Sequence, residues 1–196
     1  MSRCASRTAG RSLAYGVLLL AGAWLAAPQA GHAQHSPTEY QVKAAYLFNF
    51  LKFVEWPDDS SADLHGKWVI GVVGENPFGD ILAQAVYGKT VQGHELQVRS
   101  FQSTEDLRAC HILFISASEK KRLPSILTAL GGSSVLTVAD MDNFNASGGM
   151  IQFVMEDGSV RFVINVGTTS RARLKVSSKL LSLARVVTGA ERSATN

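Results

Sequence analysis

Three short apolar runs, separated by segments of helical character, constrain the fold of this chain more than any other feature. The runs are WVIGVVG (68–74), HILFIS (111–116) and SVLTVAD (134–140). A continuous apolar run of this length is typical of a strand buried on both faces, as in a parallel sheet. Strands that alternate with helices indicate βαβ units. The sequence therefore predicts an α/β fold with a largely parallel central sheet flanked by helices.

The other expected elements follow from caps, turns and periodicity. MIQFVMEDGSVRFVINV indicates a late antiparallel hairpin at the edge of the sheet, because Asp-Gly at 157–158 is a strong hairpin turn. A further strand is expected over 95–101. Helices are expected over Glu39 to about Val54 (capped by Thr38), Phe78 to Val86, 104–109, Ser118 to Leu130, 170–175, and from Ser177 to Gly189.

Residues 1–33 have the features of a secretory signal peptide. Three arginines precede an uncharged apolar run over 13–27, and small residues lead to a cleavage point after Ala33. A membrane anchor is the alternative, but the run is shorter than the roughly 20 residues of a bilayer span. We predict export and cleavage, which leaves a single domain over 34–196.

Removal of this leader changes the charge and the cysteine content. The chain has 19 Lys+Arg and 16 Asp+Glu, and the leader holds three of the arginines and no acid, which leaves 16 of each. A formally neutral protein gives no indication of nucleic acid as a partner. Cys110 then remains as the only cysteine. We expect a buried thiol beside an apolar strand, with an intermolecular disulfide as the alternative.

Motifs that carry chemistry are missing from the sequence. GENPFGD follows the first apolar run, but it lacks the Lys-Ser/Thr pair of a phosphate-binding loop, and GxGxxG is absent. Neither HExxH nor CxxC occurs, and no GxSxG surrounds Ser116 or Ser118. We therefore expect a binding protein rather than an enzyme, with no cofactor and no metal.

The helix expected from Glu39 onward has more aromatic residues than one buried face requires. At 100° per residue, Gln41, Lys52 and Glu55 form a narrow polar stripe, and the apolar arc is much wider than the roughly 100° of a single buried face. Phe48 falls inside the polar stripe. Either the helix is enclosed by other elements of the same fold, or part of its surface contacts a partner.

Several segments together resemble the YfiR family. They are VKAAYLFNFLKFVEWP, GVVGENPFGD, ACHILFIS, GGMIQFVMEDGSVRFVIN and SSKLLSLARVV, in order along the chain. The resemblance implies a periplasmic α/β protein without catalytic activity that binds the periplasmic part of an inner-membrane diguanylate cyclase and holds it inactive. It also implies sequestration by an outer-membrane lipoprotein resembling YfiB, and a homodimer. Cys110 matches a family cysteine, but no second cysteine follows the leader, so the family's disulfides are not expected.

Two main hypotheses follow from these observations. In the first, the protein represses a membrane diguanylate cyclase through a contact surface that includes Phe48, Phe53 and Trp56. In the second, it is a periplasmic small-molecule sensor that works with a different receptor, and its ligand-binding residues are Gly74, Pro77, Phe78 and Asn165. An exported hydrolase with an unrecognised site is the weakest alternative, because no pair of nucleophile and base is visible.

Overall fold

The computed structural model describes residues 38–57, 66–103 and 106–188 of the 196-residue chain. Residues 36–196 cluster as one compact unit, and the described residues all belong to it. The predicted signal peptide, residues 1–33, lies outside the described residues. Its cleavage and the domain boundary at residue 34 stay predictions.

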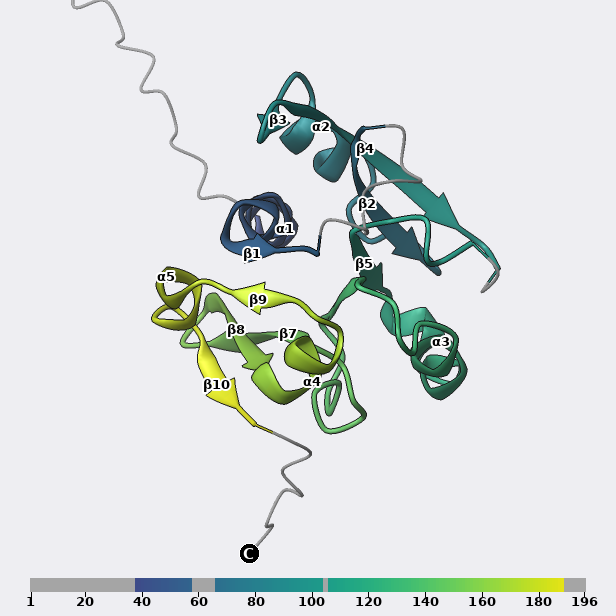
Figure 1. Cartoon of the computed structure of the whole chain (residues 1–196), viewed down its shortest axis with the longest axis vertical. Helices are drawn as coiled ribbons and strands as arrows, with labels where there is room; N and C mark the ends of the chain where they lie inside the picture. Colours follow the sequence, from purple (N-terminus) through teal and green to yellow (C-terminus); the bar gives the residue numbers. More distant parts are fainter. Residues whose placement is uncertain (1–37, 58–65, 104–105, 189–196) are drawn as a thin grey trace, which may run out of the picture. The chain divides into compact units, whose positions relative to one another are not determined.

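An eight-stranded sheet forms the centre of this unit (Figure 1). A separate two-stranded antiparallel sheet joins β1 (Val54–Glu55) to β9 (Lys175–Val176). The strands of the large sheet, in spatial order, are β10 (Arg185–Val187), β8 (Ser159–Asn165), β7 (Ile151–Glu156), β6 (Leu136–Ala139), β5 (Ile112–Ile115), β2 (Trp68–Val73), β4 (His94–Phe101) and β3 (Thr90–Val91).

The middle of the sheet is parallel, which confirms the predicted fold class. Neighbouring strands from β4 to β7 all pair in parallel, and the register places Ile70, Ile112 and Leu136 side by side. β7 and β8 form the expected antiparallel hairpin around residues 157–158. The three apolar runs became central strands because a strand with helices on both faces buries every side chain.

Helices cover both faces of the sheet. They are α1 (Glu39–Phe53), α2 (Ile81–Val86), α3 (Leu123–Ala129), α4 (Val166–Arg171) and α5 (Ser178–Leu181), with a 3₁₀ turn, η2, at Ala117–Glu119. Thr38 caps α1, and its side chain and that of Gln41 form a reciprocal capping box. Alternate residues of β2 separate the two cores: Ile70 and Val72 belong to the core with α1 and α2, whereas Val69 and Val73 belong to the core under α3.

The C-terminal part of the chain differs from the prediction. The helix expected from Ser177 to Gly189 ends at Leu181, and Arg185–Val187 form β10, parallel to β8. The hairpin is therefore not the edge of the sheet. Hydrogen bonds to β8 outweigh the weak helical preference of this segment, which contains two valines, since valine favours strands.

Two other helices are shorter than predicted. The segment from Ser118 to Leu130 is divided into η2 and α3, and Ser116 caps η2 in place of Ser118. Pro124 lies in the first turn of α3, where proline is tolerated because its missing N–H has no partner there anyway. The helix expected from Phe78 starts only at Ile81.

Candidate functional site

The inner aromatic residues of α1 belong to the core. Phe50 packs against Phe153 and Phe162 of the hairpin, with ring centroids 6.0 and 5.3 Å away. Tyr46 contacts the same two rings. Figure 1 shows α1 nearly end-on between α2 and α5. Much of the wide apolar arc is thus enclosed within the fold, which leaves the outer aromatic residues to be explained.

Phe48 and Phe53 are half-buried, and lysine side chains lie over their rings. The Nζ atoms of Lys52 and Lys89 lie 4.2 and 4.6 Å from the centroid of Phe48. Lys179 of α5 lies 5.2 Å from the centroid of Phe53. Five residues of helix correspond to about 140° of rotation, so the two rings are on different sides of α1. Each aromatic–lysine pair thus places an ammonium group over a half-buried apolar ring.

Trp56 lies just beyond the end of α1 and joins a different group of rings. Its indole is edge-on to Trp68, at 5.2 Å, and 6.1 Å from His111. His111 accepts a hydrogen bond at Nδ1 from the backbone amide of Val69. Burial, with a smaller contribution from the charge of His94, lowers the pKa of His111 to about 4. The three residues predicted to contact a partner thus have three separate environments, and their role stays a prediction.

Three of the predicted ligand-binding residues lie together, and the fourth is remote. Gly74, Pro77 and Phe78 form the loop after β2, and Phe78 is buried against Tyr40 and Phe114. A Cβ atom on Gly74 (φ +89°) would come within 2.5 Å of Ser118 Oγ, so this position requires glycine. Asn165 ends β8, and β5, β6 and β7 separate that strand from β2.

Asn165 has a structural role in its own surroundings. Its side chain is buried, accepts a hydrogen bond from the amide of Thr168 and so caps α4. Its amide nitrogen donates to the carbonyl of Asn145 at 3.4 Å. The structure therefore does not bring the four predicted residues around one pocket.

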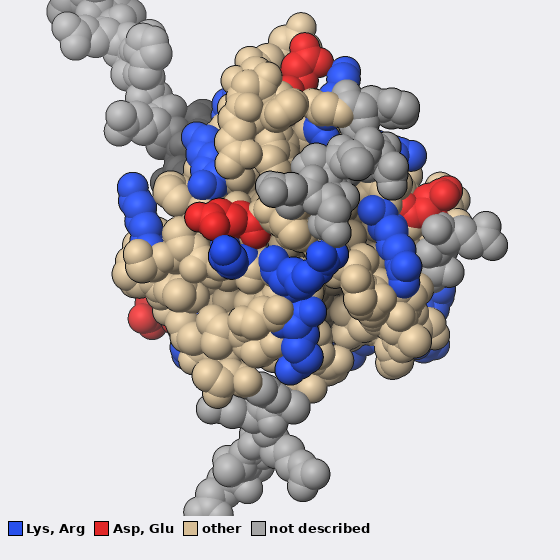
Figure 2. Space-filling view, viewed as in Figure 1, with Lys and Arg blue, Asp and Glu red and all other residues tan. Residues whose placement is uncertain are grey.

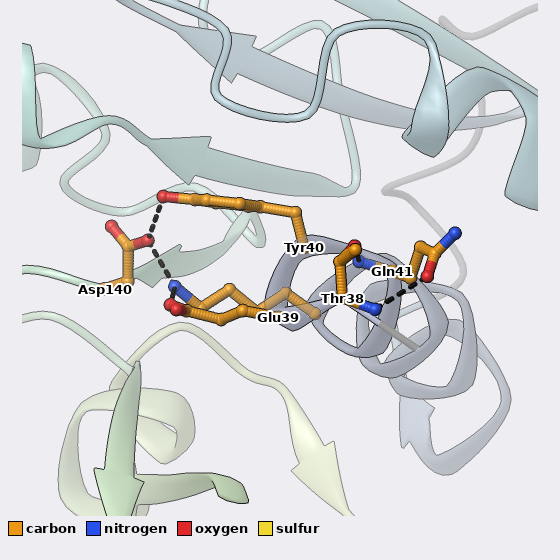
Figure 3. Close-up of polar contacts among 6 residues, drawn as sticks. Thr38, Glu39, Tyr40, Gln41 and Asp140 are labelled. Carbon is orange, nitrogen blue, oxygen red and sulfur yellow. Dashed lines mark hydrogen bonds and ion pairs between the residues drawn. The ribbon is translucent and has the colours of Figure 1, made fainter. Parts of the chain in front are cut away.

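A polar cluster anchors the start of α1 to the end of β6 (Figure 3). Lys43 is buried, and its Nζ lies 2.6 Å from Asp140 Oδ2 and also pairs with Glu39. The hydroxyl of Tyr40 donates to the same Asp140 oxygen at 3.1 Å. Because Asp140 follows β6, the cluster ties the first helix to the centre of the sheet.

Burial and charge act in opposite directions on this cluster. Burial on its own lowers the pKa of Lys43, but hydrogen bonds to Asp140 and Glu39 outweigh it, and the pKa of Lys43 lies above its usual value. Burial and the charge of Asp140 both raise the pKa of Tyr40. The polar stripe considered in the sequence did not include Lys43. Lys43 lies on the side of the helix opposite that stripe, among the apolar residues, and a charged residue in that position predicts a buried partner of opposite charge.

Cys110 is a buried thiol, as expected. It is 2% exposed, and Sγ donates to the carbonyl of Leu107 at 3.2 Å. Burial raises its pKa to about 12, so the reactive thiolate is scarce at neutral pH.

The described residues contain neither a candidate metal site nor a helix that could span a membrane. No group of three or more His, Cys, Asp or Glu residues among them could hold a metal ion. None of their helices is long and apolar enough to span a bilayer.

The structure is thus that of an α/β protein whose first helix has lysine side chains over two of its phenylalanine rings, Phe48 and Phe53. A family model described as YfiR/HmsC-like matches residues 40–185, which is most of the chain. The chain therefore belongs to the YfiR/HmsC-like family, and this confirms the resemblance found in the sequence. The family is a regulatory, non-catalytic kind of periplasmic protein associated with diguanylate cyclases. A search of curated proteins gave no match.

Proposed function

We propose that this protein is exported to the periplasm and represses an inner-membrane diguanylate cyclase by binding its periplasmic domain. The observation that carries the proposal is the family match over residues 40–185. Under this proposal residues 1–33 are removed as a signal peptide, and the domain from residue 34 acts without catalysis. An outer-membrane lipoprotein resembling YfiB then competes for the repressor, and a homodimer is its working form.

The aromatic–lysine pairs of α1 support this mode of action. Aromatic rings at a surface supply most of the binding energy in many interfaces, and a lysine stem above the ring shields it until a partner displaces it. Figure 2 shows Lys and Arg side chains gathered near the middle of the face drawn there. A basic area of this kind favours an acidic partner surface and a complex that weakens as salt is added.

Calorimetric titration against the periplasmic domain of the diguanylate cyclase from the same source tests the proposal. We expect saturable binding with a Kd in the micromolar range or tighter. Addition of the protein to membranes that contain the cyclase should then lower cyclic-di-GMP synthesis. Binding without any change in synthesis would refute repression. Absence of binding by a folded sample would refute the choice of partner.

Phe48→Ala tests the contact surface. Phe48 is half-buried, so we expect the melting temperature to change little, while partner affinity falls about tenfold or more if the ring is an interface anchor. Tyr87→Ala is the matched control, because Tyr87 is an aromatic residue that is 88% exposed and has no assigned role. A large fall in melting temperature with unchanged affinity would assign Phe48 to the core instead.

A further inference from the structure

A cavity of about 360 Å³ lies where β2 and β5 begin, at the opposite end of these strands from the Gly74 loop. Its lining includes Trp56, Trp68, His111 and, from the surrounding loops, Lys67 and Gln92. A volume of this size accommodates a small organic molecule. None of the ligand-binding residues predicted from the sequence belongs to this lining.

Two tryptophan rings and the ring of His111 form one wall of the cavity, and the rest of the lining is largely polar. The ring of Trp68 lies 4.2 Å from that of His111, with an interplanar angle of 57°, and Trp56 is edge-on to Trp68 at 5.2 Å. Trp68 is fixed in place because its Nε1 donates to the carbonyl of Val91 at 2.9 Å. The rings therefore form a rigid apolar surface against which a flat molecule can pack.

Two buried nitrogen atoms of these walls have no hydrogen-bond partner. Over the ranges that the structure describes, neither Trp56 Nε1 nor His111 Nε2 meets an acceptor. Both are donors: indole nitrogen only donates, and His111 Nδ1 already accepts from Val69, so the neutral ring carries its proton on Nε2. Buried donors nearly always have a hydrogen-bond acceptor in native proteins, so two donors without one beside a cavity need an explanation.

We propose that this cavity is a binding site for a small molecule that has a flat apolar body and a carboxylate or carbonyl oxygen. Because both nitrogen atoms are buried in the unliganded protein, binding displaces the half-buried ring of Trp56. The oxygen then accepts hydrogen bonds from Trp56 Nε1 and His111 Nε2, while the body packs against Trp68. The lining holds one lysine and one glutamate: Lys67, which is also paired with Glu95 at 3.1 Å, attracts an anionic group, and Glu55 opposes it. A neutral carbonyl oxygen is therefore accommodated as well as a carboxylate. The proposal concerns the protein alone and does not depend on the diguanylate cyclase.

The test uses protein expressed from the complete coding sequence, with benzoate, benzamide and benzylamine as probes. The three share a ring, and they carry a carboxylate, a neutral carbonyl and a cation respectively. NMR of ¹⁵N-labelled protein should show the Trp56 indole N–H resonance move on addition of benzoate or benzamide, and not on addition of benzylamine. Binding of both acceptors identifies the oxygen as the determinant, and binding of benzoate alone identifies the anion.

Trp56→Phe retains a ring and removes the donor, so it should raise the Kd for benzoate about tenfold. Tyr40→Phe, at the other end of α1, removes an aromatic donor away from the cavity and should leave the Kd unchanged. If the NMR spectrum of Trp56→Phe shows that this variant does not fold, the Kd for benzoate is measured with His111→Asn instead. Equal binding of benzylamine, an unmoved indole resonance at the solubility limit of the acceptor probes, or unchanged benzoate affinity in both cavity variants would overturn the proposal.

Discussion

His111 illustrates how the neighbours of one side chain set its affinity for a proton. It is 2% exposed, lies against Trp68 and accepts a backbone hydrogen bond, and these contacts all favour the neutral ring. Its pKa is lowered to about 4, whereas in the unfolded chain it has the ordinary value of 6.5. The unfolded state therefore binds more protons between these two values, and acid favours unfolding.

We expect the free energy of unfolding to fall as the pH drops from 6.5 towards 4. The shift sets an upper limit of about 3 kcal/mol, and access of water through the adjacent cavity reduces it. Urea denaturation at a series of pH values measures the slope. His111→Asn preserves an acceptor near Val69 but does not titrate, so its slope over this range should be smaller. Identical slopes in the two proteins would show that other groups cause the acid sensitivity.

Cys110 should react only when the protein unfolds. Its thiol is buried and its pKa is raised to about 12. The sulfur atom is therefore inaccessible and almost entirely protonated at neutral pH, and both properties slow its attack on a disulfide reagent. We expect labelling by an aromatic disulfide reagent at neutral pH to follow the unfolding rate, and the native protein to show no disulfide-linked dimer on a non-reducing gel. Rapid stoichiometric labelling of folded protein would contradict this expectation.

At the scale of the element, α1 is attached differently along its length. Its start is held by Asp140 through Lys43 and Tyr40, its middle is buried against the hairpin, and its end leads into β1 and the ring of Trp56. A helix fixed at both ends presents its outer side chains in a constant orientation. This is the property that a contact surface requires.

Removal of one partner from the Lys43–Asp140 pair should destabilise the fold strongly. Lys43→Met leaves a partly buried carboxylate that keeps the hydrogen bond from Tyr40 but loses its ion pair, and we expect a loss of about 2–4 kcal/mol in unfolding free energy. Adding Asp140→Leu to this variant should restore part of that loss, because the carboxylate that remains, Glu39, is exposed to solvent. Denaturant unfolding of both variants gives the comparison. Lys121→Met, at an exposed position in the turn before α3, is the control and should change stability by less than about 0.5 kcal/mol. Equal stability of the wild type and Lys43→Met would show that the pair contributes nothing.

At the scale of the whole molecule, the parts that the sequence predicts are those with a local cause. The central strands follow from continuous apolar runs, α1 from its cap at Thr38, and the hairpin from Asp157-Gly158. The helix predicted from Ser177 to Gly189 was wrong at its end, because the three-residue strand β10 is defined by its pairing with β8, and the periodicity of the sequence carries no information on that pairing. The cavity joins Trp56 to His111, and the polar cluster joins Lys43 to Asp140. Contacts between residues so far apart in the chain require the fold itself.

The position of α1 has a consequence for how the protein is made. Although α1 precedes every strand in the chain, Tyr46 and Phe50 reach their final neighbours only when Phe153 and Phe162 have arrived. A chain synthesised from its N-terminus therefore exposes this aromatic helix until the hairpin has also been made. Contacts of such long sequence separation also slow folding. The helix that the finished fold encloses is thus, in the nascent chain, an exposed apolar segment that needs protection from aggregation.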